Sequence, residues 1–169
     1  MTYPMERQGR ARRWLLPAAA TGLAHWFFGN LYEAIIVSPN SMAIIEAGQN
    51  PGETMFPRIA PTWYYMPHGV LTPLAVGAAL IVGRHDATRR ASLLWAAGGT
   101  LVGEALTAVA VTQVNLKLYV GKNRETDPVR MRSLQRLWDT VNAARLISVG
   151  VALIATLQAM KPTDTHVAA

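Results

Sequence analysis

Several polar residues stand inside or at the edge of long apolar stretches that carry almost no other charge. A charged side chain at the centre of a bilayer costs roughly 2.5–3.5 kcal/mol on insertion scales, so such residues usually face the interior of a helix bundle and have a function. Counted along the helical rise, they fall at similar depths in the outer half of a membrane. The group consists of His25, Glu33, His68, Glu104, Asn115, Asn142 and Arg145.

These residue types are suited to acid/base chemistry on a lipophilic molecule. Glu104 or His68 can act as the base that removes a proton. Hydrogen-bond donors can stabilise the enolate that this step leaves, and we assign that role to Asn115, Asn142 and Arg145. We expect the substrate to be bound by His25, Glu33, Trp26, Trp63 and Trp138.

A structural alternative accounts for the same residues one at a time. Glu104 and Arg145 can form a buried ion pair between the third and fourth apolar stretches, because an unpaired charge there would be costly. Asn115 and Asn142 can be interhelical hydrogen-bonding residues. His25 stands among aromatic residues, as a packed core histidine would.

The chain is not expected to bind a metal or another cofactor. It has no cysteine and four histidines, and it has no Glu-x-x-His motif of the kind that di-iron helix bundles use. A site built from His25, His68 and one carboxylate stays open as the alternative.

The elements that must position these residues are apolar helices. Hydrophobic residues make up 51% of the 169 residues and charged residues 15%, against about 25% charged residues in a soluble domain. Four stretches are long enough to cross about 30 Å of hydrocarbon: 14–37, 67–83, 91–119 and 134–160. The sequence therefore predicts a single all-α domain, residues 1–169. Its fold would be an antiparallel bundle of four transmembrane helices, with a proline-rich extracytoplasmic loop at 38–66.

Arginines set the expected orientation. They precede the first stretch and occupy the turn between the second and third, and positive charges mark the cytoplasmic side. Both termini are therefore predicted to be cytoplasmic, in what we take to be a bacterial plasma membrane. The basic loop between the third and fourth stretches conflicts with this rule.

Because the basic residues lie in short flanks, no nucleic acid is expected as a partner. The expected partners are a lipophilic small molecule and membrane lipid, and a homo-oligomer is left open.

Two segments resemble a known family. The stretch TQVNLKLYV and the later RLWDTVNAARLI resemble the anthrone-oxygenase-like family of small membrane proteins, over the C-terminal half of the chain. The matching positions are Asn115, Trp138 and Arg145. The resemblance implies about four spans and a cofactor-independent oxygenation of tricyclic aromatic polyketides; extending that activity to this chain is an analogy.

Three functions follow as hypotheses. The first is an intramembrane oxygenase acting on an aromatic or polyketide-like substrate. The second is a non-redox isomerase or cyclase that uses the same residues, and oxygen consumption separates the two. The third is a non-catalytic membrane subunit or carrier, in which the polar residues only hold the helices together.

Overall fold

The computed structural model describes residues 4–55, 62–120 and 124–161, with the backbone alone at 4–12, 62–64 and 66–68, and within these ranges the regular structure is entirely helical. The first long rod consists of α1 (Pro4–Tyr32), the π-helical segment η1 (Glu33–Val37) and α2 (Ser38–Glu46). After the short α3 (Pro51–Thr54), α4 (Thr62–Gly83) forms the second rod. The third consists of α5 (Ala87–Val109), the π-helical η2 (Ala110–Asn115) and α6 (Leu116–Leu118), and α7 (Pro128–Met160) is the fourth. The predicted all-α class is confirmed.

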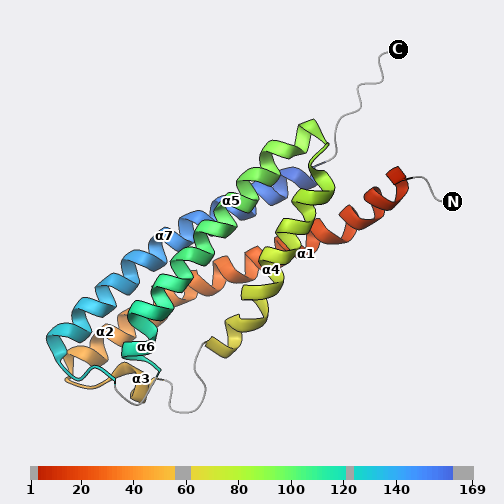
Figure 1. Ribbon diagram of the computed structural model, residues 1–169. Helices are drawn as coiled ribbons and strands as arrows, with labels where there is room; N and C mark the ends of the chain where they lie inside the picture. Colours follow the sequence, from red (N-terminus) through yellow and green to blue (C-terminus); the bar gives the residue numbers. More distant parts are fainter. Residues whose placement is uncertain (1–3, 56–61, 121–123, 162–169) are drawn as a thin grey trace.

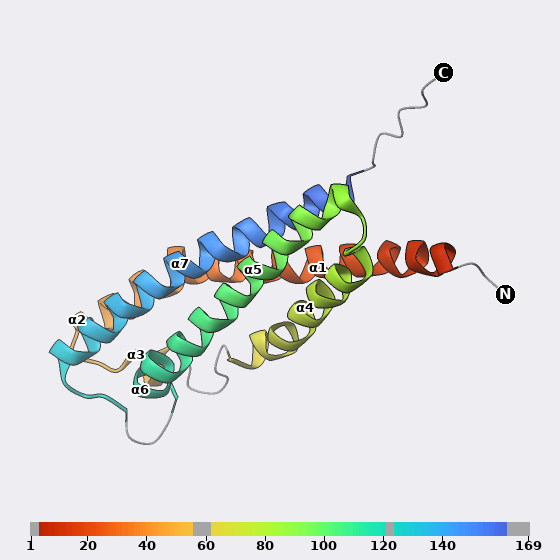
Figure 2. The ribbon, with the colours of Figure 1, turned by 45° about the horizontal axis from the view of Figure 1, so that its top comes forward.

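The rods run up and down beside one another (Figures 1 and 2). α1 packs against α4 and α7, and α5 packs against the same two helices. The start of α1, the turn between α4 and α5 and the end of α7 lie at one end, here called the proximal end (Figure 1). α2, α3, α6 and the start of α7 lie at the other, the distal end.

The first rod is longer than the sequence predicted. Residues 38–46 were expected to belong to a loop because of the prolines, but they continue the helix as α2. Pro39 follows directly on the π turn, in which the Ser38 N–H reaches the carbonyl of Glu33, five residues back. A proline ring clashes with the carbonyl four residues before it in a regular α-helix. We attribute the tolerance of Pro39 to this wider turn. Because the helix continues past Pro39 to Glu46, Glu33 lies in the interior of the rod and not near its end.

Apolar side chains cover the outside of the rods. Trp95, Leu101 and Ile147 are each about two-thirds exposed, and comparable exposed apolar residues occur on α1 and α4. The interior has a small-residue core around Leu23, Trp26 and Val149. It also holds buried polar residues: Asn30, Ser38, Ser41, Thr72, Thr100, Gln135, Asn142, Arg145 and Thr156.

Two helical segments of the described chain are long and apolar enough to cross a membrane, Ala87–Leu118 and Pro128–Met160. Gly69–Gly83 is a shorter apolar segment. Length and composition thus mark two of the four expected spans, and the crossing of all four rods remains a prediction.

Candidate functional site

An ion pair between the first and last rods forms the centre of the site. Arg145 Nη2 lies 3.1 Å from Glu33 Oε2, and the two side chains are only 8% and 12% exposed. The same Nη2 donates to Asn142 Oδ1 at 2.8 Å. Asn142 Nδ2 in turn donates to the backbone carbonyl of Asn30 at 3.0 Å. Four residues therefore join α1 and η1 to the middle of α7.

The partner of Arg145 differs from the one that the sequence suggested. The structural alternative paired Glu104 with Arg145, but the ion pair is formed by Glu33. The reason is the length of the first rod, which places Glu33 deep in the bundle. Glu104 on α5 interacts electrostatically with Arg145. Its Oε1 atom is buried and has no hydrogen-bond partner among the described residues.

Beyond the ion pair, toward the distal end, lies a hydrogen-bond network that the sequence analysis missed. Ser41 Oγ and Tyr119 Oη both donate to Gln135 Oε1, each at 2.7 Å. Gln135 Nε2 donates to Ser38 Oγ at 3.1 Å and to Asp139 Oδ1 at 3.2 Å. Ser38 Oγ also donates to Asp139 Oδ1. We call this network and the ion pair together the polar seam.

The seam follows one face of the first rod and one face of α7. On α7 the spacing of Gln135, Asp139, Asn142 and Arg145 is that of a single helix face, and this was the signal available in the sequence. On the first rod the π turn makes the alignment, because its i→i−5 bond places Ser38 one turn beyond Glu33. Glu33 and Ser38 therefore both face α7. Ser38 and Ser41 gave no comparable signal in the sequence, because they fell in the predicted loop.

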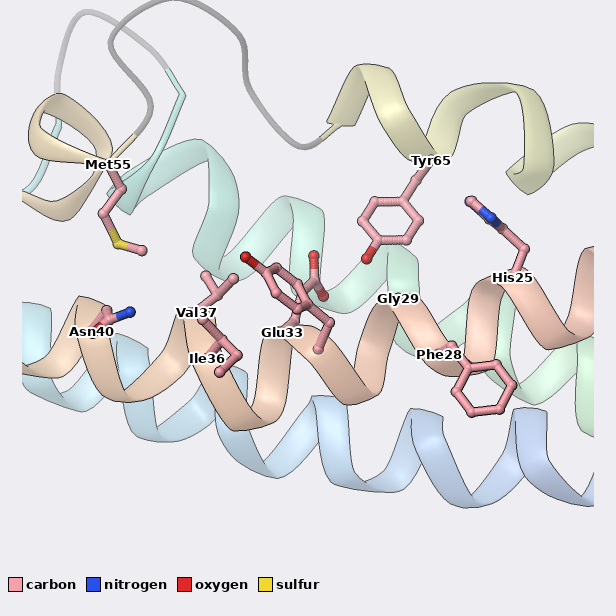
Figure 3. Close-up of a pocket in the computed structure, with 10 residues that line it drawn as sticks. His25, Phe28, Gly29, Glu33, Ile36, Val37, Asn40, Met55 and Tyr65 are labelled. Atoms are coloured by element: carbon pink, nitrogen blue, oxygen red, sulfur yellow. The ribbon is translucent and has the colours of Figure 1, made fainter.

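A cavity of about 780 Å³ lies along the opposite side of Glu33 (Figure 3). Its wall is mostly apolar and is provided by Phe28, Tyr32, Ile36, Val37 and Met55. Its polar groups belong to His25, Glu33, Asn40 and Tyr65. Glu33 thus belongs both to the seam and to the cavity wall.

Tyr65 reaches over Gly29 from α4, and its hydroxyl points toward the Glu33 carboxylate (Figure 3). A Cβ atom at position 29 would lie 2.6 Å from the Tyr65 hydroxyl oxygen. Real Cβ atoms do not approach that closely, so glycine is required at this position for Tyr65 to sit there.

The other predicted residues are distributed around this centre. Trp26 is buried in the core, where its ring would lie 3.0 Å from a Cβ at Gly103. Trp138 is buried in a distal cluster with Ile45 and Met131. Asn115 is in η2, and its Oδ1 atom is buried without a hydrogen-bond partner among the described residues. The side chains of Trp63 and His68 lie outside the described ones.

The structure therefore brings together some of the expected residues and separates others. Glu33 and His25 line the cavity. Arg145 holds the Glu33 carboxylate, and Asn142 accepts a hydrogen bond from the same Arg145 nitrogen. Among the described residues, no group of three or more His, Asp or Glu side chains is placed to hold a metal ion.

Chemically, this arrangement offers a carboxylate and a phenol at one point of an apolar cavity. A carboxylate can accept a proton, and a phenol can donate a hydrogen bond to a developing oxyanion.

Comparisons with protein-family models, curated proteins and solved structures found no match to this chain. The resemblance to the anthrone-oxygenase-like family thus stays a prediction.

Proposed function

We propose that this chain is a membrane-embedded enzyme that acts by acid/base chemistry on a lipophilic small molecule bound in the cavity beside Glu33. The observation that supports this most directly is a buried carboxylate, paired with Arg145, in the wall of an apolar cavity of about 780 Å³. Ligand sites are typically concave and apolar with a few placed polar groups, and this cavity has that character.

The distribution of side chains supports a membrane location. Large apolar residues face outward on all four rods, whereas the interior contains a charged pair and a hydrogen-bond network. Water would favour the reverse arrangement, because exposed apolar area is unfavourable there. We propose that all four rods cross the membrane, with the proximal end and its exposed Arg84 and Arg90 in the cytoplasm.

In the proposed mechanism Glu33 removes a proton from an acidic carbon of the substrate. Tyr65 donates a hydrogen bond to the enolate oxygen that results. Arg145 keeps the carboxylate in place and Asn142 holds Arg145, so both act as positioning residues. In an oxygenase the carbanion then reacts with molecular oxygen, whereas in an isomerase or cyclase it is reprotonated or closes a ring.

The test uses purified protein in lipid nanodiscs with a panel of lipophilic carbon acids, anthrones among them. Substrate loss and oxygen uptake are measured separately. Glu33→Gln keeps the shape but removes the base, so turnover should fall by about 10²–10⁴-fold. Glu46→Gln, an exposed glutamate on α2, is the matched control and should keep full activity. Glu104→Gln and His68→Ala test the bases that the sequence favoured.

Full activity in Glu33→Gln would exclude Glu33 as the base. If activity then fell in Glu104→Gln or His68→Ala, the base would be that residue and the enzyme class would stand. Oxygen uptake that matches substrate loss identifies an oxygenase; substrate loss without it identifies an isomerase or cyclase.

The polar seam favours a second candidate, a non-catalytic membrane subunit in which these residues join the rods. Interhelical hydrogen bonds serve this purpose in many membrane proteins. The Glu104 Oε1 atom, which has no hydrogen-bond partner among the described residues, argues for the enzyme, because buried groups that serve only to join helices are normally satisfied. No turnover of any panel member, together with loss of stability in Glu33→Gln, would favour the subunit.

A further inference from the structure

The cavity beside Glu33 is elongated, and its long direction follows the helix axis. The residues of the first rod that line it run from His25 to Asn40, always on one face. At 1.5 Å per residue this is about 20 Å, or roughly two-thirds of the hydrocarbon thickness of a bilayer. A compact molecule would fill only part of this length.

The rim of the cavity faces outward. Phe28 and Tyr32 are 62% and 59% exposed, although both line it. A ligand can therefore enter from the side, out of the lipid, without passing through the bundle. Once inside, it would lie parallel to the lipid chains around it.

The charges in the wall determine which polar group such a ligand can carry. Glu33 is the one charged residue among the described lining residues, and its charge is countered by Arg145. Arg145 itself does not line the cavity. Among the described lining residues, an anionic head group would thus meet a carboxylate and no cation, whereas a hydroxyl or carbonyl group finds Glu33, Tyr65 and Asn40.

We infer that the cavity binds an elongated, uncharged lipid whose hydroxyl or carbonyl group lies at Glu33 and Tyr65 and whose chain follows the first rod. This inference rests on the proposed function for the identity of the site, and it specifies the class of substrate. Its apolar chain packs along Phe28, Ile36 and Val37. The ligand enters laterally from the leaflet at the distal end.

The experiment measures binding without turnover. A long-chain alcohol carrying a photoreactive diazirine is incorporated into nanodiscs with the full chain, and the fatty acid of the same chain length serves as the anionic probe. Labelled peptides are mapped, and the half-saturating concentration of each probe is determined. The alcohol should label the first rod between His25 and Asn40. The ionised acid should need a concentration higher by roughly 60-fold or more, given the cost of an unpaired charge at membrane depth.

Two tryptophan substitutions supply a matched pair. Ile36 and Ile35 are neighbours in η1 and both are exposed, but only Ile36 lines the cavity. Ile36→Trp should fill the cavity and raise the half-saturating concentration of the alcohol at least about tenfold, which corresponds to about 1.4 kcal/mol. Ile35→Trp should leave it unchanged. Because both side chains point outward, both variants should fold.

Equal labelling by alcohol and acid, or labelling that Ile36→Trp does not reduce, would overturn the inference. These results are separate from those of the turnover test. Selective labelling by the alcohol with no turnover would support the inferred class of ligand and refute the proposed enzymatic function. Turnover that depends on Glu33, with no preference for the alcohol, would support the enzymatic function and refute the inferred class of ligand.

Discussion

Neutralising Arg145 should destabilise the protein strongly, and neutralising Glu33 as well should recover part of the loss. Arg145→Met removes the cation and leaves a Glu33 carboxylate that is only 12% exposed. Breaking a buried ion pair by removing one partner costs about 3–5 kcal/mol, chiefly because a buried charge is left uncompensated. We expect Arg145→Met to fall within this range.

Glu33→Gln should cost less, because the amide oxygen can still accept a hydrogen bond from Arg145. This retained hydrogen bond, from the charged Arg145 to the amide oxygen, is worth about 1.5–3 kcal/mol. The double variant has neither charge and should be no less stable than Arg145→Met. The two substitutions should therefore be non-additive by about 2 kcal/mol or more, well above the roughly 0.5 kcal/mol scatter of independent sites.

The assay is reversible unfolding in mixed micelles with increasing sodium dodecyl sulfate, followed by circular dichroism. A parallel cycle pairs Arg145→Met with Glu104→Gln. Because Glu104 interacts with Arg145 only electrostatically and does not form the ion pair, its coupling should be smaller. Additive effects for Glu33, or a larger coupling for Glu104, would refute the assignment of the ion pair.

Three further predictions follow from the same structure. Gln135→Leu should destabilise by about 2–4 kcal/mol in the unfolding assay, because it leaves polar partners buried, while exposed Gln158→Leu should be nearly neutral. Deleting Ile35 from a chain with Pro39→Ala should change the free energy of unfolding by less than about 1 kcal/mol. The deletion brings the Ser38 N–H to four residues after the Glu33 carbonyl, which is the spacing of a regular α-helix. Deleting Asn40 from the same chain should cost more, because Ser41 turns away from Gln135. In inverted and right-side-out vesicles, an impermeant thiol reagent should reach Gln49→Cys from outside and Thr88→Cys from the cytoplasmic side; the opposite pattern would reverse the orientation.

The polar residues illustrate how far sequence reasoning reached. Arg145 and Asn142 were singled out because a charge in an apolar stretch needs a partner, and the structure shows both in one hydrogen-bonded group. Glu33 was expected to bind the substrate from a first span that ends at residue 37, and not to pair with Arg145. Its role depends on where the first helix ends, and prolines made that end look earlier than it is.

The network around Gln135 illustrates the opposite case. Serine, glutamine and tyrosine are ordinary residues at a helix end, and nothing in their types marks them as buried. They become one network because α2 continues past the π turn and lies against the start of α7. Contacts between residues about a hundred positions apart depend on how the rods pack against one another. A local sequence pattern carries no information on that packing.

The sequence by itself determined the helical class and the presence of polar residues within long apolar stretches, because these follow from hydrophobic periodicity and from the positions of the residue types. Only the tertiary structure decided that Arg145 pairs with Glu33, that Tyr65 lies over Gly29, and that a cavity opens beside the carboxylate. These features depend on the rotation of each rod about its own axis. In the first rod, the additional residue of the π turn changes that rotation for the residues beyond Val37, and so it also decides that Ser38 and Ser41 face Gln135.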